Sequence, residues 1–200
     1  SRGGRGVNLF PRSLDIVAEK PCATPPAVTV IVTLYNYAEH IADCLDSIAV
    51  QTQSGIEIVI VDDKSDDASL ALAAEWLKRE GARLAGYKLI AHRQNMGLAY
   101  TRNTAFGAAS RDRVFVMDAD NLLYPRAITA CMAAMDESGS EGAYTQLELF
   151  GDATGIGEAD FWSKERFKRN NYIDAMALVS KAAWAKAGGY KQLSVSGWED

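Results

Sequence analysis

The sequence predicts an α/β domain in which a Rossmann-like, mostly parallel sheet is flanked by helices. Three observations lead to this prediction: apolar runs rich in β-branched residues, helical patterns of about a dozen residues between them, and acidic residues directly after several runs. Strands and helices that alternate in this way form right-handed βαβ units. With 200 residues, 48% of them hydrophobic, the chain can bury one sizeable core.

The apolar runs mark the strands. Continuous runs such as VTVIVTL and IEIVIV are typical of strands buried on both faces of a parallel sheet. A weaker apolar run lies between the second and third strong runs, and the regular alternation of strand and helix patterns ends after Gly142. Strands are therefore expected over 28–34, 56–61, 88–91, 113–117 and 144–150.

The segments between the strands carry helical periodicity. Ser65 or Asp66 is suited to cap the second helix, Pro125 suits the first turn of the fourth, and Gly188 suits the end of the last. Helices are expected over 38–50, over the segment after this cap, over 98–109, over 125–135 and over 180–187.

Residues 1–27 differ from the rest, because glycine, proline and scattered charges replace hydrophobic periodicity. We expect a flexible or draped leader there and one domain over 28–200. Arginines at positions 2, 5 and 12 either remain solvated or contact an acidic lipid or polymer.

Composition excludes several classes of protein. A net charge of −5 is unsuited to nucleic-acid binding, which needs a clustered basic surface. Cys22, Cys44 and Cys131 lack metal-ligand spacing and indicate free thiols in a reducing compartment. No apolar run approaches the roughly 18 to 20 residues that span a bilayer, and no signal-peptide pattern is present. We therefore expect a cytoplasmic location, with peripheral contact at the inner face of a membrane left open.

Polar residues follow the predicted strands at the edge where open α/β sheets bind ligands. Four carboxylates on one edge repel each other unless water, a cation or hydrogen-bond donors offset the repulsion. The residues concerned are Thr33, Tyr35 and Asn36 after the first strand, Asp62 and Asp63 after the second, and Asp118 and Asp120 after RVFVM.

Asp118 and Asp120 stand two residues apart, so both carboxylates can point to one side, and the small Ala119 lets a ligand approach. Carboxylates together with diphosphate oxygens and water suit Mg²⁺ or Mn²⁺. The alternative is that Asp118 and Asp120 bind nothing and only open the turn before Pro125. Asp62 and Asp63 have a similar alternative, in which they only cap the helix that follows them.

Other phosphate-binding and hydrolytic motifs are absent from the sequence. It has no GxxxxGK[ST] and no GxGxxG after a strand, and it lacks GxSxG and HExxH. His40 and His92 lie far apart without ligand spacing, so we interpret each as a surface or packed residue.

Together these features resemble the family 2 inverting glycosyltransferases, which have the nucleotide-sugar-binding GT-A fold with a DxD motif at a strand end. The resemblance extends from about Val28 to Asp200. Its landmarks, in order, are VTVIVTLYNYAEHIADCLDSI, VIVDDKSDD, NMGLAYTRNTA, VFVMDADN, and GGY followed by GWED.

The resemblance implies a site for a nucleotide diphosphate sugar, most often linked to UDP. Arg102 would either contact this ligand or pair with an aspartate, and both alternatives stay open. The implied binding residues are Thr33, Tyr35, Asn36, Asp62, Asp63, Asn95, Gly97, Arg102, Asp118 and Ala119.

The resemblance also implies catalytic roles. Asp120, with Asp118, would hold Mn²⁺ or Mg²⁺, and Asp200 would deprotonate the acceptor hydroxyl. Trp198 and Glu199 would lie on the acceptor side. The acceptor would be a glycan, a lipid-linked molecule or a polysaccharide. Members of the family normally continue beyond the residue that corresponds to Asp200. We therefore expect that the domain is truncated at Asp200 and that a further domain follows it.

Two other classes of protein remain open. A sugar-phosphate nucleotidyltransferase also combines an α/β sheet with acidic metal ligands, but it normally has a Gly-rich basic loop where this chain has LYNYAEH. A non-catalytic carbohydrate- or nucleotide-binding module would keep the fold without turnover.

Overall fold

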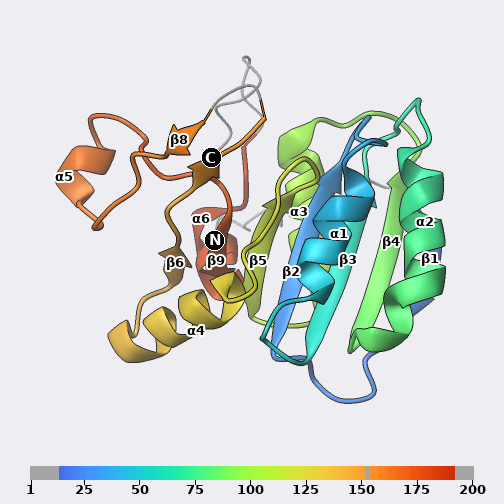
Figure 1. Cartoon of the computed structure of the whole chain (residues 1–200), viewed down its shortest axis with the longest axis horizontal. Coiled ribbons are helices and arrows are strands. Elements are labelled where there is room, and N and C mark those ends of the chain that lie inside the picture. The colour runs from blue at the N-terminus through green and yellow to red at the C-terminus, as the bar shows by residue number, and fades with distance from the viewer. Residues whose placement is uncertain (1–13, 152–153, 192–200) are drawn as a thin grey trace, which may run out of the picture.

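The computed structural model describes residues 14–151 and 154–191, in which a central sheet lies between two layers of helices (Figure 1). The strands are β1 (Leu14–Lys20), β2 (Val28–Leu34), β3 (Ile56–Asp62), β4 (Gly86–His92), β5 (Arg113–Asp118), β6 (Gly142–Tyr144), β7 (Glu148–Leu149), β8 (Gly155–Ile156) and β9 (Ala177–Ser180). The helices are α1 (Ile41–Ala49), α2 (Ser69–Glu80), α3 (Leu98–Ala108), α4 (Ala127–Ser138), α5 (Lys164–Phe167) and α6 (Lys181–Ala187), with a 3₁₀ turn, η1 (Gly81–Arg83).

The main sheet has the order β1-β4-β3-β2-β5-β9-β6. Its centre, β4-β3-β2-β5, is parallel, whereas β1, β9 and β6 join antiparallel. Strands β7 and β8 form a separate two-stranded ribbon. The predicted α/β architecture with a mostly parallel sheet is therefore confirmed.

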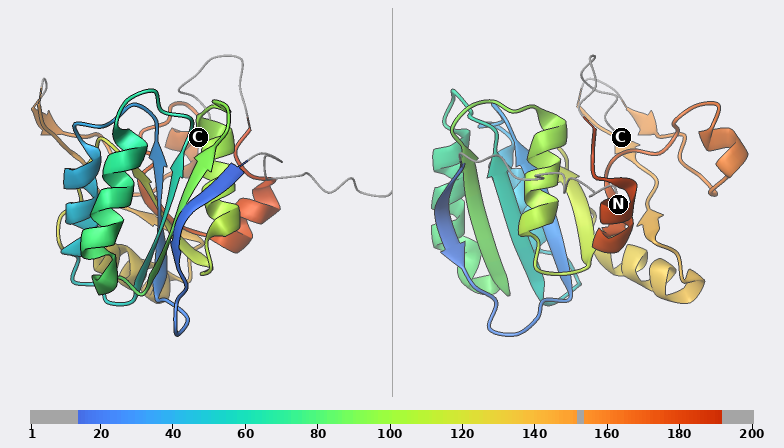
Figure 2. Two further views of the ribbon diagram at one scale, coloured as in Figure 1. Left: turned by 90° about the vertical axis from the view of Figure 1, so that its right-hand side faces the viewer. Right: turned by 180° about the vertical axis from the view of Figure 1, so that it is seen from behind.

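The central strands are buried on both faces, as their unbroken apolar runs predict. Every residue of β2 and of β3 is buried. Val30 and Val32 face the layer of α1, α2 and α4, whereas Ile31 faces the layer of α3 and α6. The view from behind shows α3 lying across the second face of the sheet (Figure 2). Two apolar cores therefore hold the sheet between them.

The interpretation of residues 1–27 as a flexible leader is wrong for Leu14–Lys20, which form β1 beside β4. Most side chains of this edge strand are exposed or half-buried; Ile16, for example, is 57% exposed. Backbone hydrogen bonds hold such a strand, so its sequence carries no strong apolar pattern. The strand covers the outer edge of β4.

The single strand expected over 144–150 is also wrong. The chain forms β6, leaves the main sheet, and then forms β7, which pairs with β8. Strand β9 then returns between β5 and β6. Alternation alone does not distinguish one strand from two short ones with different partners.

The caps differ from those expected for α2. This helix begins at Ser69, whose backbone N–H is bonded by Asp67 Oδ1 at 2.9 Å, so Ser65 and Asp66 stand before it. Ser180 does cap α6, because its hydroxyl accepts from the Ala183 N–H. Within the described ranges, no helix is both long and apolar enough to cross a bilayer.

We predict that Gly86→Ala destabilises the chain. A Cβ at Gly86 would lie 2.4 Å from Cys22 Sγ and 2.8 Å from the Lys20 backbone oxygen, so β1 or β4 would have to shift. Overpacking of this kind costs about 1–3 kcal/mol, measurable by urea unfolding.

Gly157→Ala is the matched control, because its Cβ would meet the Leu147 side chain at an ordinary 3.4 Å. An unchanged unfolding midpoint for Gly86→Ala would contradict the docking of residues 14–27 against β4.

Candidate functional site

A cavity of about 470 Å³ opens at the carboxyl ends of the parallel strands. It lies between the ends of β2 and β5 and the segment that leads into α3, at the edge where open α/β sheets bind ligands. Its lining residues are Thr33, Leu34, Tyr35, Tyr37, Asp63, Asn95, Gly97, Leu98, Thr101, Asp118, Asp120 and Asn121.

Strand register brings the polar residues of this edge together. Thr33 of β2 is directly opposite Asp118 of β5, and its hydroxyl donates to Asp118 Oδ1 at 3.1 Å. On the other side, Leu34 is opposite Asp62 of β3. Residues from three separate strands are thus fixed at one level of the sheet.

Arg102 pairs with Asp118. The Arg102 side chain is 98% buried, and its Nη2 lies 3.3 and 3.4 Å from the two oxygens of Asp118. The same guanidinium stands over the ring of Tyr190, with its carbon 5.3 Å from the ring centroid. Of the two roles expected for Arg102, the structure has the pairing with an aspartate, and the side chain does not line the cavity.

Asp120 differs from Asp118 in its electrostatics. Its side chain is exposed at the cavity and has no ion pair within the described part of the chain, although Asn121 Nδ2 lies 3.4 Å from Oδ1. The pKa of Tyr37 is raised by burial and by the charges of Asp120 and Asp118. Burial and the same two charges also raise the pKa of the Cys44 thiol. Asp120 therefore brings to the cavity wall a negative charge that has no ion pair among the described residues.

These two carboxylates fit a hard divalent cation that shares its coordination with a ligand. Among the described residues, no group of three or more His, Cys, Asp or Glu side chains is placed to enclose a metal. Mg²⁺ and similar ions are commonly held by one or two carboxylates, with phosphate oxygens and water completing the octahedron. Asp120 offers a carboxylate without a counter-charge, and Asp118 stands beside it.

Asp62 lies beneath the cavity wall rather than on it. The residue is 99% buried, and its Oδ2 accepts from the Ser65 N–H at 3.1 Å. Its Oδ1 has no hydrogen-bond partner among the described residues. A buried carboxylate oxygen in this state favours a bound donor group.

Asp63 reaches the cavity, but its carboxylate is mostly occupied by the protein. Oδ1 accepts from His92 Nδ1 at 2.7 Å and from the Met96 N–H at 2.8 Å, and Oδ2 accepts from the Gly97 N–H at 2.8 Å. Asn95 Nδ2 donates to the Asp63 backbone oxygen at 3.2 Å. Asp63 therefore shapes the segment on which Asn95 and Gly97 line the cavity.

Two other predicted site residues, Asn36 and Ala119, contact the protein itself and not the cavity. Asn36 has a left-handed φ of 57°; its side-chain oxygen accepts from the Asp66 N–H at 2.8 Å, and its own N–H donates to Ser65 Oγ at 3.0 Å. Ala119 is fully buried in the core, so its small side chain packs there. Neither residue lines the cavity.

Sequence reasoning missed Tyr37 and Thr101, which line the cavity. The spacing of Tyr37, two residues after Tyr35, was an available signal. It also missed the role of Asn103, whose Oδ1 accepts from Trp184 Nε1 at 3.0 Å and from the Tyr190 N–H at 2.8 Å. Helix α3 thus anchors the turn after α6. Trp198, Glu199 and Asp200, predicted for the acceptor side and the base, lie outside the described residues.

Comparison with known proteins identifies the relatives of this chain. The model of glycosyl transferase family 2 matches residues 29–184. EpsH of Bacillus subtilis, named as a glycosyltransferase, is 38% identical over 100 residues, 50% of this chain and 28% of EpsH. ExoO of Rhizobium meliloti, a succinoglycan biosynthesis protein, is 32% identical over 124 residues, 62% of this chain and 34% of ExoO.

Solved structures share the fold. TarS 1–349 of S. aureus in complex with UDP superposes with a TM-score of 0.71 at 21% identity and covers 86% of this chain and 52% of TarS 1–349. The mannosyltransferase PcManGT of Pyrobaculum calidifontis, in complex with GDP-Man and Mn²⁺, superposes with a TM-score of 0.65 at 20% identity. The match covers 84% of this chain and 48% of PcManGT. The fold is thus of the GT-A type, and the chain spans half or less of the curated relatives named here.

We predict that Arg102→Met destabilises the fold, because Asp118 would lose the guanidinium that faces it. Removal of one partner of a buried pair costs about 3–5 kcal/mol, and we expect less here because the Asp118 side chain is 29% exposed. Urea unfolding measures the loss.

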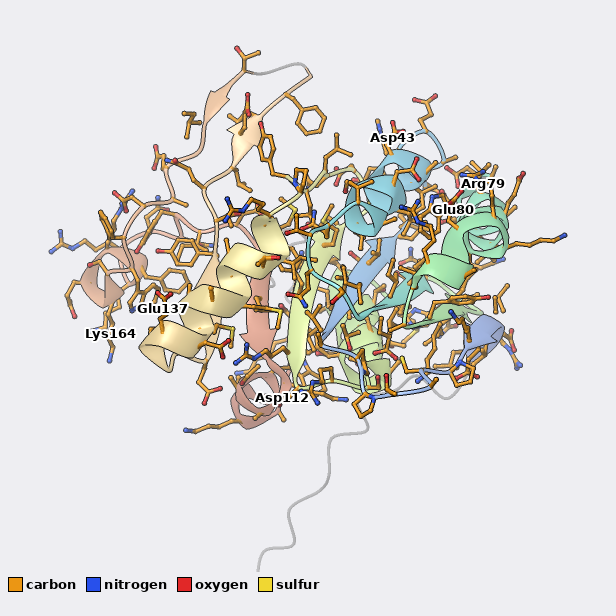
Figure 3. The ribbon with its side chains drawn as sticks, turned by 60° about the horizontal axis from the view of Figure 1, so that its bottom comes forward. Asp43, Arg79, Glu80, Asp112, Glu137 and Lys164 are labelled. Atoms are coloured by element: carbon orange, nitrogen blue, oxygen red, sulfur yellow. The ribbon has the colours of Figure 1, made fainter. Side chains whose placement is uncertain are left out.

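The control is Arg79→Met, which removes an exposed pair with Glu80 on the outer face of α2 (Figure 3). Its unfolding midpoint should hardly move. Equal effects of the two substitutions would contradict a buried role for the Arg102–Asp118 pair.

Proposed function

The chain belongs to glycosyl transferase family 2, and we propose that it binds a nucleoside diphosphate sugar with a divalent cation and transfers the sugar, with inversion, to an acceptor hydroxyl. The observation that carries the proposal is the arrangement at the end of β5. Asp118 is held by Arg102, and Asp120 faces the cavity without a counter-ion in the described ranges. This arrangement suits a cation that carries a diphosphate.

The nucleoside would lie against the ends of β2 and β3. Thr33 and Tyr35 line the cavity there, and Tyr35 is 43% exposed, which leaves its ring available to a base. Asp62 is 99% buried beneath this wall and does not line the cavity, so we propose no direct contact between its carboxylate and the nucleoside. TarS was solved with UDP, so we propose UDP as the nucleotide.

Mn²⁺ or Mg²⁺ bound at Asp120 and Asp118 would act as a Lewis acid that stabilises the leaving diphosphate. PcManGT, which shares the fold, was solved with Mn²⁺ and GDP-Man, which supports a divalent cation alongside the nucleotide sugar. Arg102 and Thr33 would hold the Asp118 carboxylate in its orientation, because both donate to it.

In the proposed transfer, the carboxylate of Asp200 accepts the proton of the acceptor hydroxyl. The hydroxyl oxygen attacks the anomeric carbon as the bond from that carbon to the diphosphate breaks, so the configuration inverts. General-base help of this kind contributes roughly 10²- to 10⁴-fold. Trp198 and Glu199 are proposed for the acceptor side. The name of ExoO supports a glycan or polysaccharide acceptor, with a lipid-linked acceptor as a variant.

The proposal predicts nucleotide binding that depends on the cation. Calorimetric titration with UDP, GDP and dTDP, each with Mn²⁺ or with EDTA, should show tight binding of one nucleotide only when Mn²⁺ is present. Asp120→Asn should weaken this binding about tenfold or more, because one charged ligand of the cation is lost.

Asp43→Asn is the control, because this carboxylate projects from the exposed face of α1 (Figure 3). It should bind like the unaltered chain. Mn²⁺-dependent affinity that survives in Asp120→Asn would refute the proposed cation site, and failure to bind any of the three nucleotides would refute the donor proposal.

A further inference from the structure

A buried hydroxyl, imidazole and carboxylate form a hydrogen-bonded chain beneath the cavity. Thr104 Oγ1 lies 3.0 Å from His92 Nε2, and His92 Nδ1 lies 2.7 Å from Asp63 Oδ1. The three residues come from α3, from the end of β4 and from the residue after β3. They are 0%, 2% and 4% exposed.

The partners of the carboxylate decide where the imidazole proton lies. Asp63 already accepts the Met96 and Gly97 N–H groups, one on each carboxylate oxygen. His92 Nδ1 is therefore placed to donate its proton to Asp63, and Nε2 faces the Thr104 hydroxyl. The Thr104 hydroxyl, which can donate or accept, thus completes the hydrogen bonds of the ring that faces Asp63.

The same order of groups activates nucleophiles in hydrolases, but the burial here excludes that role. Thr104 has no exposed surface and does not line the cavity, so a substrate cannot reach its hydroxyl. Of the three residues, Asp63 alone lines the cavity. The chain can act on a ligand only through what Asp63 holds.

What Asp63 holds is the segment that precedes α3. Its backbone oxygen accepts from Asn95, and its carboxylate accepts from the Met96 and Gly97 N–H groups. Gly97 has φ of 84°, a conformation that a side chain rarely adopts, and it stands at the N-cap of α3. Asn95 and Gly97 both line the cavity. The shape of this wall therefore depends on the orientation of one carboxylate.

We propose that His92 is a positioning residue: it fixes Asp63 and, through it, the Asn95–Gly97 wall, and so sets the affinity for the nucleoside diphosphate. The effect on affinity rests on the proposed function, whereas the effect on the wall does not. His92 touches no ligand itself, because it is buried and absent from the cavity lining.

Two substitutions distinguish positioning from packing. The amide nitrogen of Asn reaches the place of Nδ1, so His92→Asn keeps a donor for Asp63. Gln reaches the place of Nε2 instead, so His92→Gln fills the space better but loses that donor. If His92 only packs, His92→Gln should be the less damaging variant. If His92 positions Asp63, His92→Asn should be the less damaging one.

The test measures two quantities in each variant: amide hydrogen exchange at residues 96 and 97, and the dissociation constant of whichever of UDP, GDP and dTDP binds the unaltered chain. We expect His92→Gln to speed exchange and to raise the dissociation constant about tenfold, the equivalent of one hydrogen bond to a charged group. His92→Asn should restore both values. His40→Gln, at the exposed second histidine, should change neither.

Unchanged exchange in His92→Gln, or equal defects in the Gln and Asn variants, would overturn the proposal. If these variants do not fold, Thr104→Val serves, because it removes only the hydroxyl that bonds Nε2 and holds the imidazole against Asp63. It should also speed exchange at 96 and 97, and unchanged exchange would overturn the proposal. If the unaltered chain binds no nucleotide, the proposed function fails, and the exchange measurement still decides the role of His92.

Discussion

The hydrogen-bonded register of β3, β2 and β5 is the constraint on which the site depends. It sets Thr33 opposite Asp118 and Leu34 opposite Asp62, so groups far apart in sequence end at one level. Apolar side chains on both faces hold these strands between two helical layers. A slip of one residue would turn every side chain of a strand to the opposite face. The register is therefore fixed by the same burial that stabilises the fold.

The carboxylates at this edge fall into two kinds: those that the protein itself bonds, and Asp120, which faces the cavity. Asp118 and Asp63 are bound by groups of the protein, the first by Arg102 and Thr33 and the second by His92 and two backbone N–H groups. Asp120 faces the cavity with no ion pair in the ranges described. The bound carboxylates give the site its shape, and the exposed one leaves charge for a ligand. This division distinguishes a binding site from a set of helix caps.

The central sheet and its acidic edge could be predicted from the sequence. Long apolar runs indicate buried strands, and the residues that follow parallel strands lie at one edge of the sheet. It did not predict β1, whose exposed side chains leave no pattern, or the separate ribbon of β7 and β8, which depends on distant pairing. His92 was interpreted as a surface or packed residue, and the structure has it packed; its bond to Asp63 joins residues 29 positions apart. Whether an aspartate contacts a ligand or the protein depends on such contacts, which spacing does not reveal.

We propose that a nucleotide sugar binds at the acidic edge of the sheet. A crystal structure of the chain with Mn²⁺ and its nucleotide tests this claim most directly. We expect the diphosphate beside Asp120 and the base against β2 and β3. The chain has a second cavity, of about 400 Å³, lined in part by Lys20, Cys22 and Lys88. A nucleotide bound there, with the acidic edge empty, would contradict the account.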